Sequence, residues 1–140
     1  GWLEGKRVWD LFAGSGALGL EALGCGASKV AFVDRNSKAC REITRFLTDR
    51  AALDRAVIVR GDVRGSLERI DFTPDLVFAD PPYADGRASR WLAEHDWNET
   101  ASPGGRVFVE SGAEVEMPGW KRRGYGGSVL HELILSRERG

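Results

Sequence analysis

The segment Asp80-Pro81-Pro82-Tyr83 is the part of the sequence whose residue types and spacing point most directly to chemistry. It follows the apolar run Leu76-Val77-Phe78-Ala79, which has the composition of a buried strand. A carboxylate, two residues with fixed φ angles and an aromatic ring at the mouth of such a strand can hold an exocyclic amine in a fixed plane. The pattern therefore favours transfer of a methyl group to nitrogen, with these candidate catalytic residues: Asp80, Pro81, Pro82 and Tyr83.

A second motif is the glycine loop at residues 10–19, which lies where a first strand should turn into a first helix. Gly14 and Gly16 can adopt backbone conformations that other residues avoid, and they let a ligand touch the main chain. Asp34 follows Gly14 by 20 residues, at the end of the second expected strand, where a carboxylate can bind the hydroxyls of a ribose. The letters G-x-G-x-x-G fit both a dinucleotide and S-adenosylmethionine.

Two further carboxylates favour S-adenosylmethionine. Asp10 precedes the glycine loop, where it repels a pyrophosphate but attracts a cationic amino-acid group. Asp62, followed by Val63, ends the third expected strand and can accept a hydrogen bond from an adenine amino group, although a simple helix cap explains it equally well. The candidate cofactor-binding residues are Asp10, Gly14, Gly16, Asp34, Asp62 and Val63.

Short apolar strands alternate with amphipathic helices, which predicts a mostly parallel, doubly wound α/β sheet. We expect strands at residues 7–12, 29–34, 56–60, 75–79 and 106–110, and helices at about 16–25, from a cap at Ser37, and at about 88–97. In such a sheet the first and fourth strands are neighbours, so the glycine loop and Asp80 should face each other. Residues 119–136, with Gly126-Gly127 between two strand-like runs, predict a terminal hairpin that adds an antiparallel edge.

Length and composition limit the remaining possibilities. A chain of 140 residues that is 42% hydrophobic is expected to form one domain over residues 1–140. Its formal charge of −1 is not the strongly basic balance of a self-sufficient nucleic-acid binder, and clusters such as Arg45, Arg50, Arg55, Arg60 and Arg64 are explained equally well by solvated helix faces. The sequence has neither an apolar run of about 20 residues nor a signal peptide at its start, so we expect a cytoplasmic protein.

Four residues that often carry chemistry receive no such role from the sequence. Cys25 and Cys40 lack the paired spacing of a zinc site, and they imply neither a metal nor a disulfide framework. His95 and His131 are each solitary, which disfavours a general-base role. We therefore expect a protein without a metal site, and we expect a monomer.

The segment from Val8 to Leu23, which contains the glycine loop, is followed by Gly26-Ala27 and Val33-Asp34. Together they resemble the RsmD family of bacterial methyltransferases, which modify the N2 of a guanine in small-subunit ribosomal RNA. The resemblance continues through Arg60-Gly61-Asp62 and residues 75–83, and more loosely through residues 103–105 and 123–126. It implies a Rossmann-like class I fold, and a partner that is ribosomal RNA or an assembling small ribosomal subunit. It also implies that Gly14, Gly16, Asp34 and Asp62 contact S-adenosylmethionine, and that Asp80 to Tyr83 hold the target base.

The chain departs from the family at its start. Family members usually carry a further segment before the first strand, including an arginine-rich hairpin that helps to bind RNA. Here the first expected strand begins a few residues after Gly1, so we expect a fragment with reduced RNA affinity.

The expected mechanism is direct, in-line transfer of the sulfonium methyl group to the amine of an unstacked guanine. Asp80 and the adjacent backbone carbonyl would accept the two amine hydrogens, while Tyr83 would stack on the base. Three alternatives remain. The first is a DNA adenine-N6 methyltransferase, which has a similar Pro-Pro loop but needs a target-recognition segment. The second is a dinucleotide-dependent oxidoreductase, in which residues 80–83 would have no role. The third is a module that binds S-adenosylmethionine without turnover.

Overall fold

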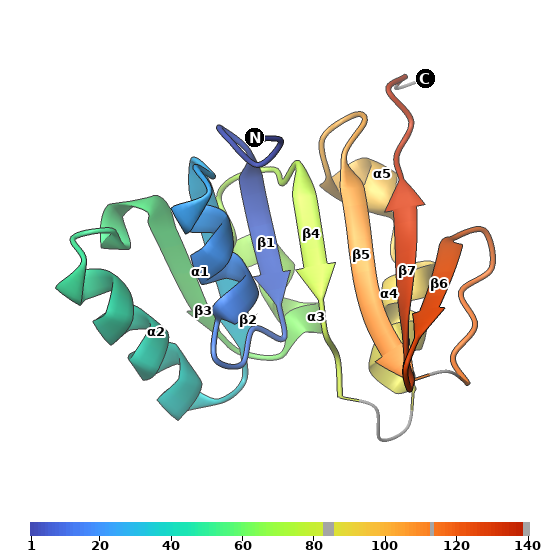
Figure 1. Cartoon of the computed structure of the whole chain (residues 1–140), viewed down its shortest axis with the longest axis horizontal. Coiled ribbons are helices and arrows are strands. Elements are labelled where there is room, and N and C mark those ends of the chain that lie inside the picture. Colours follow the sequence, from blue (N-terminus) through green and yellow to red (C-terminus); the bar gives the residue numbers. More distant parts are fainter. Residues whose placement is uncertain (83–85, 113, 139–140) are drawn as a thin grey trace.

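The computed structural model describes residues 1–82, 86–112 and 114–138 of the chain. One seven-stranded sheet forms its centre, with the strand order β3-β2-β1-β4-β5-β7-β6 (Figure 1). The strands are β1 (Arg7–Leu11), β2 (Lys29–Asp34), β3 (Ala56–Arg60), β4 (Leu76–Ala79), β5 (Arg106–Gly112), β6 (Lys121–Tyr125) and β7 (Ser128–Ile134).

The first five strands are parallel, and β7 pairs antiparallel with both β5 and β6. The predicted fold class, a mostly parallel doubly wound α/β sheet with an antiparallel C-terminal hairpin, is therefore confirmed. The carboxyl ends of β1 and β4 lie together at the lower edge of Figure 1. The strand order reverses between these two strands, which is where doubly wound sheets bind ligands.

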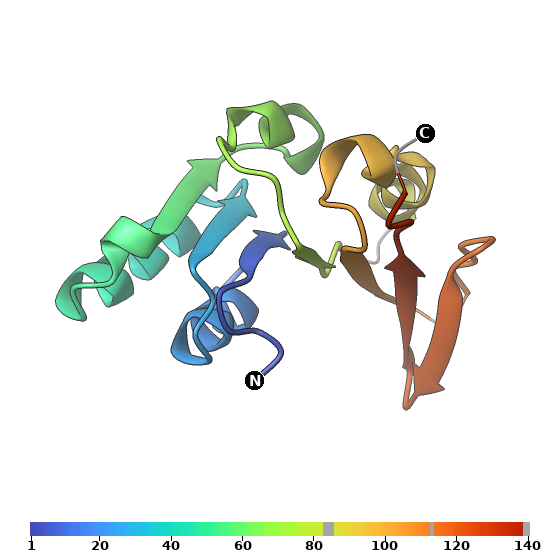
Figure 2. The same ribbon diagram turned by 90° about the horizontal axis from the view of Figure 1, so that it is seen from above.

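Helices cover both faces of the sheet (Figure 2). One face carries α1 (Ala17–Gly24) and α2 (Ser37–Asp49). The other carries α3 (Val63–Ser66), α4 (Arg87–Glu94) and α5 (Trp97–Thr100). Short 3-10 turns, η1 (Leu53–Arg55) and η2 (Leu67–Arg69), lie on either side of β3 in the sequence. Within the described ranges, no helix is both long and apolar enough to span a bilayer.

The alternation of side chains along the strands gives each face its own core. Trp9 and Leu11 of β1 belong to the core under α3, α4 and α5. Val8, by contrast, packs with Phe32 and Ile43 in the core under α1 and α2. Because both faces are covered, the central strands are apolar on both sides, as parallel sheets require.

The fourth strand begins at Leu76 rather than at residue 75, and the fifth extends to Gly112 rather than to residue 110. Three further differences from the sequence-based expectation have a local reason. The first strand ends at Leu11 because Phe12 has a left-handed φ of 59°, which turns the chain out of the sheet. The cap of α2 is Asn36 rather than Ser37, since the Asn36 side chain accepts a hydrogen bond from the Ala39 N–H. The helix expected at 88–97 is divided into α4 and α5 by His95 and Asp96, and Asp96 caps the second one.

Candidate active site

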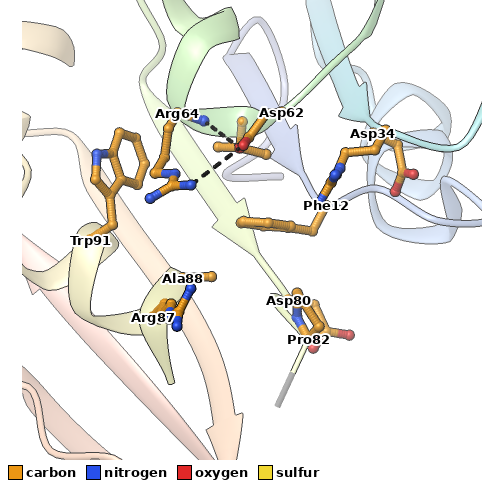
Figure 3. A pocket seen from close by; sticks show the side chains of 11 residues that line it. Phe12, Asp34, Asp62, Arg64, Asp80, Pro82, Arg87, Ala88 and Trp91 are labelled. Carbon is orange, nitrogen blue, oxygen red and sulfur yellow. Dashed lines mark hydrogen bonds and ion pairs between the residues drawn. The ribbon is translucent and has the colours of Figure 1, made fainter. Parts of the chain in front are cut away.

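A cavity of ≈ 570 Å³ opens at the carboxyl edge of the sheet, at the reversal between β1 and β4 (Figure 3). Its walls come from the ends of β1, β2 and β4 and from the first turns of α3 and α4. The lining residues are Phe12, Asp34, Arg35, Asp62, Val63, Arg64, Asp80, Pro82, Arg87, Ala88 and Trp91. Of the predicted site residues, Asp34, Asp62, Val63, Asp80 and Pro82 are thus brought together.

Asp34 ends β2 and fixes the loops on both sides of it. Its Oδ2 accepts a hydrogen bond of 2.8 Å from the Gly14 N–H, and its Oδ1 accepts one of 2.8 Å from the Asn36 N–H. Each carboxylate oxygen can accept a second hydrogen bond. Asp34 therefore holds the glycine loop against β2 while keeping capacity for ribose hydroxyls.

The two loop glycines have different surroundings. Gly14 has a φ of +56°, and no described heavy atom lies within 4 Å of the position that a Cβ would take. A ligand can therefore approach the main chain there. Gly16, with a φ of +79°, faces inward, and a Cβ there would lie 2.8 Å from Cγ1 of Ile43. Gly16 thus permits close packing of the start of α1 on α2, and neither loop glycine is among the residues that line the cavity.

Asp62 and Val63 form a second wall. The Asp62 side chain caps α3, accepting a hydrogen bond of 3.1 Å from the Arg64 N–H, and the Arg64 guanidinium lies 3.6 Å from the other carboxylate oxygen. The helix cap that was an alternative interpretation of Asp62 is therefore present, and the same side chain also lines the cavity. Val63, 1% exposed, offers an apolar surface beside it.

Asp80 lies on the opposite side of β1 from Asp34. Its N–H donates to the carbonyl of Leu11 at 3.4 Å, which continues the pairing of β4 with β1 beyond the strand end. Partial burial raises the pKa of the Asp80 carboxyl above its ordinary value. Pro81 is buried and Pro82 lines the cavity, whereas Tyr83 lies outside the described residues.

Asp10 lies beneath the glycine loop and is not among the residues that line the cavity. It is 3% exposed, and its Oδ2 accepts a hydrogen bond of 3.0 Å from the Gly19 N–H in the first turn of α1. Burial raises its pKa to about 7, with the nearby carboxylates of Asp34 and Asp80 acting in the same direction and the Gly19 hydrogen bond opposing them. Asp10 therefore anchors α1, and its contact with a cofactor stays a prediction.

Replacement of Asp10 by Asn should flatten the dependence of stability on pH. Between an unfolded pKa of 3.8 and a folded pKa of about 7, the folded chain keeps a proton that the unfolded chain has lost. The wild-type free energy of unfolding should therefore fall as pH rises from about 4 to about 7, by at most about 4 kcal/mol from this group. The amide in Asp10→Asn is uncharged and can still accept from the Gly19 N–H. Urea unfolding of both proteins across this pH range measures the difference; parallel curves would contradict the assignment.

Several residues of the cavity were missed by sequence reasoning. Arg87, Ala88 and Trp91 come from α4, which begins just after the Pro-Pro loop and so starts at the same edge. The closeness of α4 to the Pro-Pro loop in the sequence was the signal from which these three residues could have been predicted. The others are Phe12, Arg35 and Arg64, each adjacent to a predicted residue or within a predicted motif.

Neither histidine is among the residues that line the cavity. The His95 ring packs between Trp91 and Trp97, with centroid distances of 4.9 and 4.5 Å. His131 is 1% exposed, and its Nε2 is 2.7 Å from Oγ of Ser111. In the part of the chain that the structure describes, no group of His, Cys, Asp and Glu side chains has the arrangement of a metal site.

These features fit S-adenosylmethionine. The main chain is open at Gly14, and the carboxylates of Asp34 and Asp62 line the cavity together with the apolar side chain of Val63. The fold and the cavity, together with the similarity to known methyltransferases described below, define a class I methyltransferase dependent on S-adenosylmethionine. Residues 2–130 match the model of the family described as Conserved hypothetical protein 95, and the chain belongs to this family. The predicted RsmD-type membership is thereby confirmed.

The chain is similar to several known proteins. It is 32% identical to YlbH of Bacillus subtilis over 140 residues, which cover 98% of this chain and 71% of that one. It is 31% identical to the Ribosomal RNA small subunit methyltransferase D of Haemophilus influenzae over 116 residues, 79% of this chain and 58% of that one. The structure of a conserved hypothetical protein from Streptococcus pyogenes has a TM-score of 0.82 at 28% identity, covering 98% of this chain and 90% of that one.

The fold is also shared with an RNA methyltransferase from Salinibacter ruber, whose crystal structure contains S-adenosyl-L-homocysteine. The TM-score is 0.67 at 15% identity, over 96% of this chain and 84% of that one. At this identity the likeness concerns the fold alone.

Proposed function

We propose that residues 1–140 form one catalytic domain that transfers the methyl group of S-adenosylmethionine to the exocyclic N2 amine of a guanine in small-subunit ribosomal RNA. One observation supports this most directly. Asp34 and Asp80 lie on either side of the end of β1 and line the same cavity, so a cofactor held by the first and a base held by the second are neighbours. The family membership and the activity named for the Haemophilus relative favour ribosomal RNA as the substrate.

On the cofactor side, the proposed contacts follow the chemistry of each group. Asp34 would accept hydrogen bonds from the ribose hydroxyls, Asp62 would accept one from the adenine amine, and Val63 would pack against the adenine ring. The main chain at Gly14 would bind the amino-acid portion. When bound, S-adenosylmethionine supplies an electrophilic methyl group on a sulfonium centre.

On the substrate side, Asp80 orients the nucleophile. An aromatic amine is a weak nucleophile because its lone pair is delocalised into the ring. Hydrogen bonds from its two hydrogens to the Asp80 carboxylate and to the adjacent backbone carbonyl favour a pyramidal nitrogen and fix its direction. Pro82 and Trp91 present apolar surfaces to the same cavity, and Tyr83 is proposed to stack on the base.

The proposal is tested with S-adenosylmethionine that carries an isotopically labelled methyl group and unmodified small-subunit ribosomal RNA. After digestion to nucleosides, mass spectrometry should find the label in N2-methylguanosine. Label in N6-methyladenosine on duplex DNA would instead indicate a DNA enzyme. Calorimetric titration with NADH should show no binding, and binding of NADH in place of S-adenosylmethionine would indicate an oxidoreductase.

Replacement of Asp34 by Ala should weaken the binding of S-adenosylmethionine about 10- to 100-fold. A hydrogen bond to a charged group is worth about 1.5–3 kcal/mol, and the variant also releases the Gly14 N–H from its acceptor. Calorimetry gives the two dissociation constants. Glu21→Ala, at an exposed position of α1, is the control and should bind like the wild type. Equal affinities for the wild type and Asp34→Ala would remove Asp34 from the cofactor site.

We further propose that the enzyme works as a monomer in the cytoplasm, on ribosomal RNA or on an assembling small subunit. The residues that carry the proposed contacts, Asp34, Asp62, Val63 and Asp80, all line one cavity, so the proposed site needs no residue from a second copy of the chain. Sedimentation of the protein with and without RNA tests it, and a stable dimer would contradict it.

A further inference from the structure

A second cavity, of ≈ 500 Å³, lies between α2 and the edge strand β3, outside the candidate active site. It is lined by Ser37, Cys40, Arg41, Thr44, Arg45, Ile58 and Arg60. Three of these seven residues are arginines and none is acidic. In a protein with a net charge of −1, this arginine groove is a local concentration of positive charge.

The three arginines of the groove have no hydrogen-bond or ion-pair partner for their guanidinium groups among the described residues. Other arginines of the same region are engaged within the fold. Arg55 donates to two backbone carbonyls, at 3.0 and 2.6 Å, and the guanidinium of Arg50 lies 3.4 Å from the centre of an aromatic ring. The positive charge of Arg41, Arg45 and Arg60 is therefore available to an anion from outside.

The groove and the candidate active site meet at the carboxyl edge of the sheet. Arg60, in the groove, is the direct neighbour of Asp34, in the active site, in the pairing of β3 with β2. Asp80 follows β4, and β3 is followed by β2, β1 and β4 in the strand order. Neighbouring strands lie about 4.8 Å apart, so the three spacings from β3 to β4 place the ends of these two strands about 14 Å apart. A nucleic-acid strand whose base enters the cavity therefore reaches the groove within a few nucleotides.

We propose that the arginine groove binds backbone phosphates of the RNA that flanks the target nucleotide. The inference rests on the proposed function and adds to it the surface that positions the substrate. Guanidinium groups bind phosphate oxygens through paired hydrogen bonds, and the Ser37 hydroxyl at the groove can donate another. Such contacts fix the position of the strand and carry no sequence information. The arginine groove would thus orient the RNA, while the cavity selects the base.

The groove is favoured as an RNA surface over a site for an acidic protein because it adjoins a cavity proposed to take a base. Phosphate contacts leave a characteristic signature, since binding releases counterions from the nucleic acid. For single-stranded RNA, each contact contributes about 0.7 to the slope of log affinity against log salt concentration.

The test compares two double variants of α2 that lose the same charge. Arg41→Gln/Arg45→Gln removes two groove arginines, whereas Lys38→Gln/Arg50→Gln removes two cations of the same helix region that do not line the groove. Fluorescence anisotropy measures the affinity for a labelled single-stranded oligoribonucleotide across a salt series. The groove variant should lose about 1.4 from the slope and bind several-fold more weakly at low salt. The control should keep most of the wild-type slope, and both variants should bind S-adenosylmethionine like the wild type.

The possible outcomes separate the two proposals. If the groove variant keeps the wild-type slope and the wild-type KM for ribosomal RNA, the groove proposal is overturned while the proposed function stands. If the wild type binds S-adenosylmethionine but neither binds nor methylates RNA, the proposed function fails and the groove proposal fails with it. If polyglutamate binds the wild type but not the groove variant, while the oligoribonucleotide binds both proteins equally, the groove is a site for acidic proteins and the RNA proposal is overturned.

Discussion

Asp80→Ala should lower kcat for RNA methylation by about 10²-fold or more while leaving the binding of S-adenosylmethionine nearly unchanged. Asp80 lines the cavity at the end of β4, on the far side of β1 from Asp34. The proposed role of its carboxylate is to direct the amine lone pair, which matters mainly in the transition state. Its loss should therefore reduce kcat more than the affinity for either ligand.

The pH dependence of the wild type should report the same carboxyl group. Partial burial raises the pKa of Asp80, so its protonated form persists to a higher pH than for an exposed Asp. A protonated carboxyl is a weaker acceptor for an amine hydrogen, and turnover should decline as pH falls through this raised pKa. The residual activity of Asp80→Ala should lack that decline.

Single-turnover assays with labelled S-adenosylmethionine measure the effect of Asp80→Ala, and calorimetry measures cofactor affinity in the same preparations. Glu94→Ala, at an exposed position on α4, serves as the control and should retain wild-type turnover. Asp80→Asn keeps one acceptor oxygen and should lie between the wild type and Asp80→Ala. Near-wild-type turnover in both Asp80 variants would show that this carboxyl does not act on the nucleophile.

Gly19→Ala should destabilise the fold by about 1–3 kcal/mol, although alanine is the better helix former. A Cβ at Gly19 would lie 2.3 Å from Cε1 of Phe32 and 3.0 Å from Oδ2 of Asp10. Phe32 is 1% exposed and belongs to the core under α1 and α2, so its ring has no space into which to move. The substitution should also strain the Asp10–Gly19 hydrogen bond.

Gly24→Ala, in the same helix, is the matched control. No described atom lies within 4 Å of a Cβ at Gly24, so the intrinsic helix preference should prevail and stabilise the protein by about 0.5–1 kcal/mol. Removal of part of the Phe32 ring in the double variant Gly19→Ala/Phe32→Leu should cost less than the sum of the two single changes. Urea unfolding of the wild type and of the four variants, Phe32→Leu included, gives the free energies of unfolding. A stable Gly19→Ala protein would mean that α1 can move away from the sheet.

The sequence was sufficient to predict the sheet and the edge at which ligands should bind. Apolar strands alternating with helices indicate a parallel sheet, and Gly14 and Gly16 permit the turn from the first strand into the first helix. The conformations of the loops were harder to predict from the sequence. The left-handed φ of Phe12 and the break at His95 depend on tertiary packing and hydrogen bonds that overrule local preference.

Side-chain direction was the other element that the sequence did not determine. Asp10 and Asp34 were both predicted to contact the cofactor, yet Asp10 lies beneath the glycine loop and Asp34 lines the cavity. The arginine cluster from Arg45 to Arg64 was likewise explained equally well by solvated helix faces. In the folded chain Arg45 and Arg60 meet in one groove because α2 packs on β3, whereas Arg55 is directed into backbone carbonyls.

The insertion of β7 between β5 and β6 has a consequence for synthesis of the chain. Val107 and Val109 of β5 are fully buried, yet the partner that completes their sheet is residues 128–134. Until Ile134 has left the ribosome, the outer side of β5 presents unpaired N–H and C=O groups beside an apolar surface. The nascent chain therefore carries an aggregation-prone edge from the emergence of β5 onward, and closure of that edge awaits β7.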